Sequence, residues 1–191
     1  MADFRGAALD RQVRWLSADG VGLDHLHLRG RGDGIVAEGL VIGARDRVPF
    51  GLRYRIACDD RWRVREARLE LTGHDRGLHF LADGAGRWRD GDGQTLSTLD
   101  GCVDIDISAT PFTNTLPIRR LSLAAGESRD IRVLYVRVPA MSGEAVEQRY
   151  ACLETGRRYR YEGLFRGFVA EIEVDADGLV LDYPGLCRRL R

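Results

Sequence analysis

Lysine is absent from this sequence of 191 residues, and net charge is absent as well. All 29 basic residues are arginines, and 29 acidic residues balance them. The balance removes the overall positive field with which general nucleic-acid-binding proteins attract phosphates, so nucleic acid is not an expected partner. Arginine suits bidentate recognition of carboxylate or phosphate. Coding bias nevertheless explains the absence of lysine better than selection at a binding site does.

Long hydrophobic runs are also missing. No stretch approaches the roughly 18 consecutive apolar residues that a membrane-spanning helix needs. The polar N-terminus, Met1 to Gly6, is not followed by the apolar segment of a secretory signal peptide. We therefore expect no transmembrane segment and a cytoplasmic location.

The sequence lacks the paired cysteines of zinc knuckles and redox sites. Its four cysteines lie at least 35 positions apart: Cys58, Cys102, Cys152 and Cys187. His25 and His27 would share one face of a strand, but no third metal ligand lies near them in the sequence. We expect buried, reduced thiols and surface or hydrogen-bonded histidines, with neither a metal nor a cofactor.

No nucleophile elbow, phosphate-binding loop or dinucleotide fingerprint occurs in the chain. The triplet Arg31-Gly32-Asp33 lies in a glycine-rich segment and is interpreted as a turn. The segment Asp90–Gly93 begins like a calcium loop, but the further oxygen ligands and the closing glutamate are missing. We expect a hairpin turn there.

Alternation with a period of two is the dominant pattern. In Phe168–Val174 the apolar residues share one face and Glu171 and Glu173 take the other. Leu52–Ile56 and Arg158–Tyr161 alternate in the same way, with arginines on the outer face. Such half-buried strands, separated by turn residues every 8 to 15 positions, predict a mainly antiparallel all-β meander, rolled or sandwiched.

One local irregularity and two short helices are expected within a single β domain spanning 1–191. The apolar phase of Arg61–Leu71 changes midway, which predicts a β-bulge near Arg65-Glu66. Short helices are expected in Ala7–Leu16 and within Phe112–Leu121. No linker, repeat or low-complexity tract divides the domain.

The densest polar cluster spans Asp104–Thr115, and at its start Val103, Ile105 and Ile107 alternate with the two aspartates. Asp104 and Asp106 would leave the same strand face about 6.5 to 7 Å apart. Three interpretations are open: a structural network with nearby arginines, contact with a ligand, or acid and base catalysis as in inverting glycoside hydrolysis. The candidate site residues are Asp104, Asp106, Thr110, Thr113, Asn114, Arg119 and Arg120.

The run VDIDISATPFTNTLPIRRL resembles the signature of a bacterial family of glycolipid-binding proteins. Further pieces fit in order: DRWRVREARLEL, DGAGRWRDGDG, VEQRYACL and DADGLVLDYPGLCRR. The resemblance covers about Trp15 to Arg189. It implies a single curved sheet rolled into an open or spiral barrel, similar to lipid-carrier folds that hold acyl chains against a concave apolar surface.

With this resemblance, the leading hypothesis is a protein that holds an amphipathic small molecule, a glycolipid or a fatty acid, on a concave β surface. The aspartate pair with Arg119 and Arg120 would bind the headgroup. Two alternatives remain: a hydrolase or isomerase acting on a sugar or lipid through Asp104 and Asp106, and a scaffold module without a small ligand. The aromatic residues considered for the concave surface are Tyr54, Phe80, Tyr135, Tyr159, Tyr161 and Phe168.

Overall fold

The structure is a computed structural model that describes residues 9–32, 34–75 and 77–191. Fourteen strands form one mainly antiparallel sheet that does not close, as expected for an open barrel. The strands are β1 (Asp10–Ser17), β2 (Leu23–Arg31), β3 (Gly34–Arg45), β4 (Val48–Asp59), β5 (Val64–Leu71), β6 (Gly77–Ala82), β7 (Trp88–Asp90), β8 (Asp104–Ile107), β9 (Ser128–Arg137), β10 (Ser142–Glu154), β11 (Arg158–Gly163), β12 (Phe168–Val174), β13 (Val180–Tyr183) and β14 (Cys187–Leu190).

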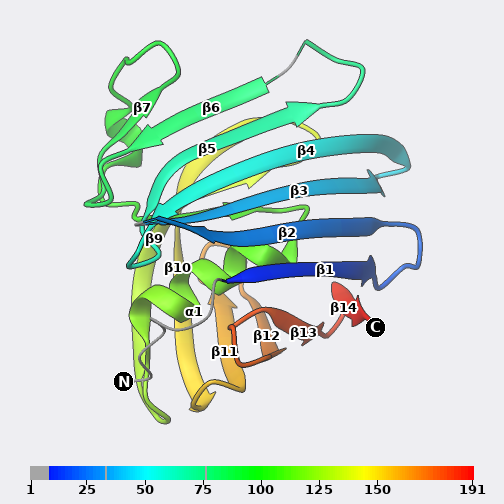
Figure 1. The fold of residues 1–191 in the computed structure, drawn as a ribbon, viewed down its shortest axis with the longest axis vertical. Helices are drawn as coiled ribbons and strands as arrows, with labels where there is room; N and C mark the ends of the chain where they lie inside the picture. Colours follow the sequence, from blue (N-terminus) through cyan, green and yellow to red (C-terminus); the bar gives the residue numbers. More distant parts are fainter. Residues whose placement is uncertain (1–8, 33, 76) are drawn as a thin grey trace.

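The sheet consists of two meanders joined where the chain's two ends meet. Its strand order is β7-β6-β5-β4-β3-β2-β1-β14-β13-β12-β11-β10-β9-β8. The first and last strands pair antiparallel, and β8 and β9 form the parallel pair. In Figure 1 the strands of the first half run across those of the second, and α1 (Thr115–Leu121) lies between the two halves.

The strands predicted from alternation are confirmed. In β4, Leu52, Tyr54 and Ile56 are almost fully buried, and in β12 the same holds for Ile172 and Val174. At the start of β12 the apolar face is open to solvent, since Phe168, its first residue, is 41% exposed.

The expected bulge is also confirmed. Between β4 and β5, Ala57 is opposite Glu66 but Cys58 is opposite Val64, so Arg65 is the extra residue. The extra residue lets Val64 and Ala67 both reach the core in spite of their different parity.

The two helix predictions have opposite outcomes. The helix expected within Phe112–Leu121 is present as the 3-10 turn η2 (Pro111–Asn114) followed directly by α1. A second 3-10 turn, η1, spans Ser97–Leu99. The helix expected in Ala7–Leu16 is wrong for its described part, because β1 pairs with both β2 and β14 and buries Val13 and Trp15 on one face.

The turn and cysteine predictions agree with the described structure. The β2–β3 hairpin carries the RGD triplet, with Arg31 opposite Gly34, while Asp33 lies outside the described residues. At Asp90–Gly93 the Asp90 carboxylate accepts the N–H groups of Asp92 and Gln94, which makes the segment a turn. All four cysteines are free and buried. No helix of the described residues is long and apolar enough to cross a membrane.

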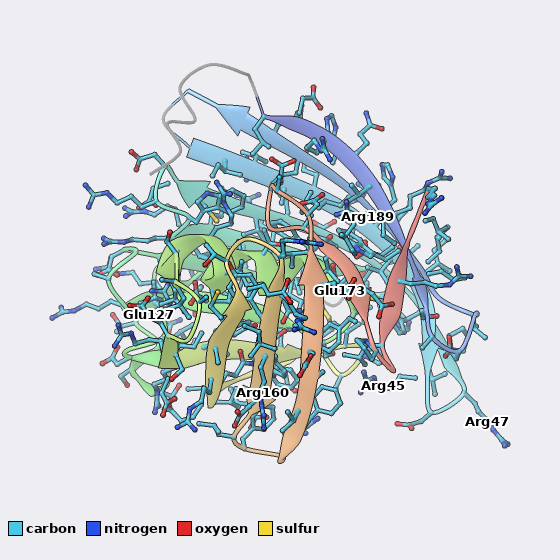
Figure 2. The ribbon with its side chains drawn as sticks, turned by 90° about the horizontal axis from the view of Figure 1, so that it is seen from below. Arg45, Arg47, Glu127, Arg160, Glu173 and Arg189 are labelled. Carbon is cyan, nitrogen blue, oxygen red and sulfur yellow. The ribbon has the colours of Figure 1, made fainter. Side chains whose placement is uncertain are left out.

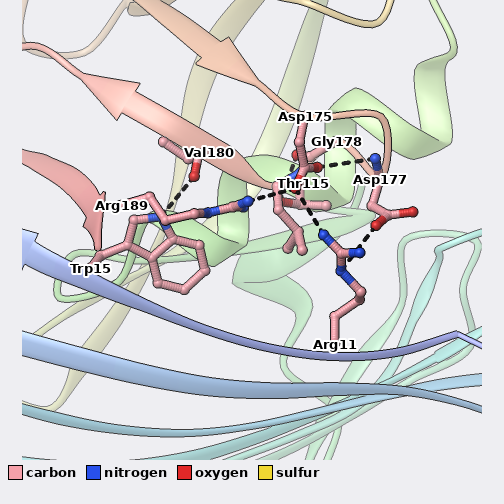
Figure 3. Close-up of polar contacts among 9 residues, drawn as sticks. Arg11, Trp15, Thr115, Asp175, Asp177, Gly178, Val180 and Arg189 are labelled. Atoms are coloured by element: carbon pink, nitrogen blue, oxygen red, sulfur yellow. Dashed lines mark hydrogen bonds and ion pairs between the residues drawn. The ribbon is translucent and has the colours of Figure 1, made fainter. Parts of the chain in front are cut away.

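A set of polar contacts holds the seam between β1 and the last two strands (Figure 3). The indole N–H of Trp15 donates to the Val180 carbonyl at 2.8 Å, and the Arg189 guanidinium lies over the Trp15 ring. Arg189 also pairs with Asp175 at 2.6 Å. Because these partners come from opposite ends of the chain, the seam forms only once both meanders are in place.

Candidate functional site

The segment Asp104–Leu121, called the inner segment below, comprises β8, η2 and α1. Strand β8 forms the edge of the sheet beside β9, and α1 lies between the two halves of the sheet. Polar side chains of the inner segment hydrogen-bond to both halves of the sheet. The Thr110 hydroxyl donates to Asp24 on β2 at 2.5 Å, and Asn114 accepts from the Tyr150 hydroxyl on β10 at 2.8 Å. These bonds fix the inner segment against the concave side of the sheet.

Asp104 forms the structural ion pair that the sequence predicted as one of three possibilities. The Arg120 guanidinium donates to both carboxylate oxygens, with an Nη2–Oδ2 distance of 2.5 Å and an Nε–Oδ1 distance of 2.9 Å. The Asp104 side chain is 1% exposed and that of Arg120 is 17% exposed. Burial raises the pKa of Asp104, and the guanidinium opposes that rise.

Asp106 lies on the same face of β8 but has a different environment. Its Oδ2 accepts from Gln148 Nε2 at 2.7 Å, and its Oδ1 accepts from the Thr113 hydroxyl at 3.2 Å. Among the described residues it forms no ion pair. Burial raises its pKa, while the two hydrogen bonds lower it.

Asp24 is a second carboxylate without a described ion-pair partner. Besides the bond from Thr110, the Tyr54 hydroxyl lies 3.5 Å from Asp24 Oδ1 and 3.2 Å from the Thr110 hydroxyl. Burial raises the pKa of Asp24 to about 7, although the hydrogen bonds from Thr110 and Tyr54 oppose the rise. A carboxyl group in this state gains or loses its proton near neutral pH.

Asp24 and Asp106 both line a cavity of about 460 Å³, called the main cavity below. The cavity lies between β1–β3, the inner segment and β11–β14. Its walls carry the aromatic side chains of Phe50, Tyr135, Tyr161, Phe165, Phe168 and Tyr183. Arg45 and Arg166 also line it, and both are exposed. The cavity therefore has buried acceptors, aromatic walls and arginines that face solvent.

A wider groove of about 1080 Å³ adjoins the main cavity. The two share lining residues that include Phe50, Tyr135 and Arg166. Apolar residues of the β3–β4 hairpin, Leu40, Ile42 and Val48, form one side of the groove. Together the cavity and groove offer a continuous surface that is polar at its inner end and largely apolar further out.

The structure brings together three of the seven candidate residues from the sequence. Asp106, Thr110 and Asn114 line the main cavity, and Thr113 supports Asp106 from behind. Asp104, Arg119 and Arg120 are not among the lining residues. The Arg119 guanidinium lies 5.2 Å from the Trp62 ring centre instead. Of the aromatic residues considered, Tyr135, Tyr161 and Phe168 line the cavity, whereas Tyr54, Phe80 and Tyr159 do not.

Asp24 was missed by the sequence interpretation, although a signal was present. Along β2, Asp24 has the same parity as Leu26 and Leu28, so its side chain points to the buried face. The two histidines take the opposite parity: His25 is exposed, and His27 contacts Asp10 at 2.8 Å. A carboxylate in the apolar phase of a strand was the informative residue.

Comparison with known proteins shows the family and the fold of this chain. A model of the family described as "Putative glycolipid-binding" matches residues 12–189. A crystal structure of a DUF1089 family protein from Pseudomonas aeruginosa superimposes with a TM-score of 0.81 at 43% sequence identity, covering 89% of this chain and 92% of that chain. No curated protein matches this chain.

Proposed function

Since the chain belongs to the family described as "Putative glycolipid-binding", we propose that it binds a glycolipid with the sugar headgroup on the carboxylates of the main cavity. The observation that carries the proposal is the pair Asp24 and Asp106, one buried and one half-buried carboxylate without an ion pair among the described residues, in one aromatic-lined cavity. Their unused lone pairs require hydrogen-bond donors. Sugar hydroxyl groups supply such donors.

The walls of the cavity support the same ligand class. Tyr135, Tyr161 and Tyr183 present ring faces and edges with polar tips, which suit the mixed polar and apolar surface of a sugar ring. The volume of about 460 Å³ falls within the roughly 300 to 1,000 Å³ of ordinary ligand sites. The adjoining groove gives the apolar chains a path toward solvent.

Within this site, Asp106 accepts from sugar hydroxyls while Gln148 and Thr113 hold its orientation. Thr110 and Asn114 contact the headgroup, and Asp24 accepts or donates according to its protonation state. Asp104, Arg119 and Arg120, which do not line the cavity, have a structural role in this proposal and do not bind the headgroup. A fatty acid fits less well, because its carboxylate would be repelled by the carboxylates of Asp24 and Asp106 in the cavity.

Competition binding tests the proposal. A fluorescent glycosyl-diacylglycerol bound to the protein is displaced with unlabelled glycosyl-diacylglycerol, diacylglycerol or oleate. We expect the glycosylated lipid to compete at least about tenfold better than the other two, since a buried acceptor without its partner loses about that much affinity. Equal competition by all three would overturn the headgroup assignment.

Two cavity variants and a surface control sharpen this test. Asp106→Asn and Asp24→Asn should weaken binding of the glycosylated lipid more than binding of diacylglycerol. Asp130→Asn, on the exposed face of β9 and paired with Arg149, should leave both unchanged. Loss of both affinities in the same ratio would indicate a general disturbance of the cavity rather than sugar recognition.

A second candidate function is hydrolysis of the bound headgroup, with Asp24 and Asp106 replacing the originally considered pair Asp104 and Asp106. Asp24, with a pKa of about 7, still carries its proton in part of the molecules at neutral pH, as a general acid must. Free sugar released from a glycosyl-diacylglycerol, and abolished by Asp24→Asn, would support this function. The scaffold alternative expected a filled interior, which the main cavity argues against.

A further inference from the structure

The large hydrophobic side chains that the structure exposes gather at one end of the fold. Val21 is 66% exposed and Val48 is 55% exposed, and Leu164 and Leu186 are exposed as well. Val21, Leu164 and Leu186 lie in the connections β1–β2, β11–β12 and β13–β14, and Val48 is the first residue of β4, directly after the β3–β4 connection. Six further exposed hydrophobic residues lie in the strands that adjoin these connections. Exposed apolar residues on a soluble surface are usually scattered, so their collection at one place requires an explanation.

These four connections surround the mouth of the main cavity. These connections and the strand ends beside them supply much of its lining: residues 17–19, 22–24, 41–45, 163, 165, 166, 168 and 185–187. Val21 and Leu164 themselves line neither the main cavity nor the groove. Their exposure therefore serves something other than contact with a ligand inside the cavity.

The four connections and the strand ends beside them are called the rim below. Arginines lie among its exposed apolar side chains. Figure 2 shows Arg45 and Arg47 at one end of the molecule, with Glu127 on the opposite side. The Arg166 guanidinium lies 5.0 Å from the Phe165 ring centre and 5.3 Å from that of Tyr135.

Two carboxylates, those of Asp19 and Asp46, lie in the same connections. Asp19 already accepts from its own turn, from the Ser17 hydroxyl at 2.5 Å and from the Val21 N–H at 3.0 Å. The connections contain two exposed arginines, Arg47 and Arg166, and Arg45 at the end of β3 adds a third. With Asp19 engaged in its own turn, these arginines carry most of the outward charge.

We propose that this rim docks on the surface of an anionic lipid bilayer. Apolar side chains at loop tips, with arginines between them, are the chemistry of interfacial membrane binding: the apolar groups enter the headgroup region and the guanidinium groups meet lipid phosphates. In this pose the mouth of the cavity and the groove open toward the bilayer. Docking depends on the rim alone and does not require the proposed glycolipid.

Sedimentation with vesicles tests the proposal on the full chain. Vesicles of phosphatidylcholine, with and without phosphatidylglycerol, are mixed with the protein and pelleted. We expect binding to the vesicles that contain phosphatidylglycerol. The double variant Val21→Ser, Leu164→Ser should bind them about tenfold more weakly or worse, because two apolar anchors are lost.

A matched pair of arginine variants separates charge at the rim from charge elsewhere. Arg47 is at the β3–β4 end of β4, and Arg61 follows the other end of the same strand. Arg47→Gln should weaken binding about fivefold on phosphatidylglycerol vesicles only, whereas Arg61→Gln should behave as the wild type does.

Affinity for the fluorescent glycosyl-diacylglycerol in detergent should be unchanged in all of these variants, which keeps this test distinct from that of the headgroup site. Absence of wild-type binding to either vesicle would overturn the proposal, as would equal binding by the Val21/Leu164 variant. A dimer in solution that the same variant dissociates, without vesicle binding, would assign the rim to a second copy of the chain and also overturn it.

Discussion

Strand β8 presents two carboxylates, two residues apart on one face, that have different surroundings. Asp104 is enclosed and held through both oxygens by Arg120. Asp106 is held by the neutral groups of Gln148 and Thr113 and lines the main cavity. The comparison teaches that proximity in sequence does not make two aspartates one site. A carboxylate that is neutralised inside the fold serves stability, and one left without a cation beside a cavity is available to a ligand.

The strongest test of this contrast is removal of one member of the structural pair. Asp104→Asn should lower the free energy of unfolding by about 3 to 5 kcal/mol, because it leaves the Arg120 guanidinium buried without its partner. Urea denaturation measures the loss. The double replacement Asp104→Leu, Arg120→Met should recover much of it. A loss below about 1 kcal/mol in the single variant would mean that water reaches this pair.

The pH dependence of stability tests Asp24, a carboxylate without an ion-pair partner among the described residues. Its pKa lies above its ordinary value of 3.8, at about 7 in the folded state. Between these pH values the unfolded chain binds fewer protons at this group than the folded chain does, so its contribution to stability falls as pH rises. The full loss corresponds to up to roughly 4 kcal/mol and is complete above pH 7.

The variant Asp24→Asn isolates that contribution. Denaturation at a series of pH values should show the wild type losing stability relative to the variant from about pH 4 to pH 7. Parallel stability curves for the two proteins would show that Asp24 has the same pKa in both states. A wild type that gains relative stability over this range would indicate a cation near Asp24 instead.

Asp106→Asn should have a small effect on stability and a larger one on ligand affinity. The amide oxygen can still accept from Gln148, so we expect a loss of about 1 kcal/mol in the free energy of unfolding. Glycolipid affinity in the competition assay should fall about tenfold. A large loss of stability with unchanged affinity would place Asp106 in the same structural class as Asp104.

The smallest effect is expected for an exposed ion pair, that of Asp130 with Arg149 on the outer face of the sheet. Their side chains are 53% and 40% exposed, so Asp130→Asn should cost less than about 1 kcal/mol. When the free energy of unfolding is measured at increasing salt concentration, the difference between the wild type and Asp130→Asn should become smaller still. A cost as large as that of Asp104→Asn would show that burial does not explain the difference.

The sequence predicted much of the fold because local alternation records which face of a strand is buried. Leu52–Ile56 and Phe168–Val174 are strands as expected, and the change of phase near Arg65 is a bulge. The N-terminal strand was mistaken for a helix because only Val13 and Trp15 of β1 are buried, so its alternation is too short to stand out. Its pairing with β14, at the other end of the chain, leaves no local pattern.

The candidate site was predicted only in part for a similar reason. The ion pair between Asp104 and Arg120 is the structural network with nearby arginines, one of the three interpretations, and both residues belong to one short stretch of sequence. The main cavity is built from four connections that are distant in sequence, so its arginines, Arg45 and Arg166, could not be told from the other arginines of the chain. Asp24 could have been found from its parity on β2, whereas its bond to Thr110 spans 86 positions.

The central claim is that the main cavity receives the sugar headgroup of a glycolipid. Native mass spectrometry of gently purified protein, followed by organic extraction of the bound material, tests it most directly. The account predicts one bound molecule per chain that yields a glycosylated lipid on extraction, with its occupancy reduced in the Asp106→Asn variant. Extraction of a free fatty acid or an unglycosylated lipid, at the same occupancy in both proteins, would contradict it.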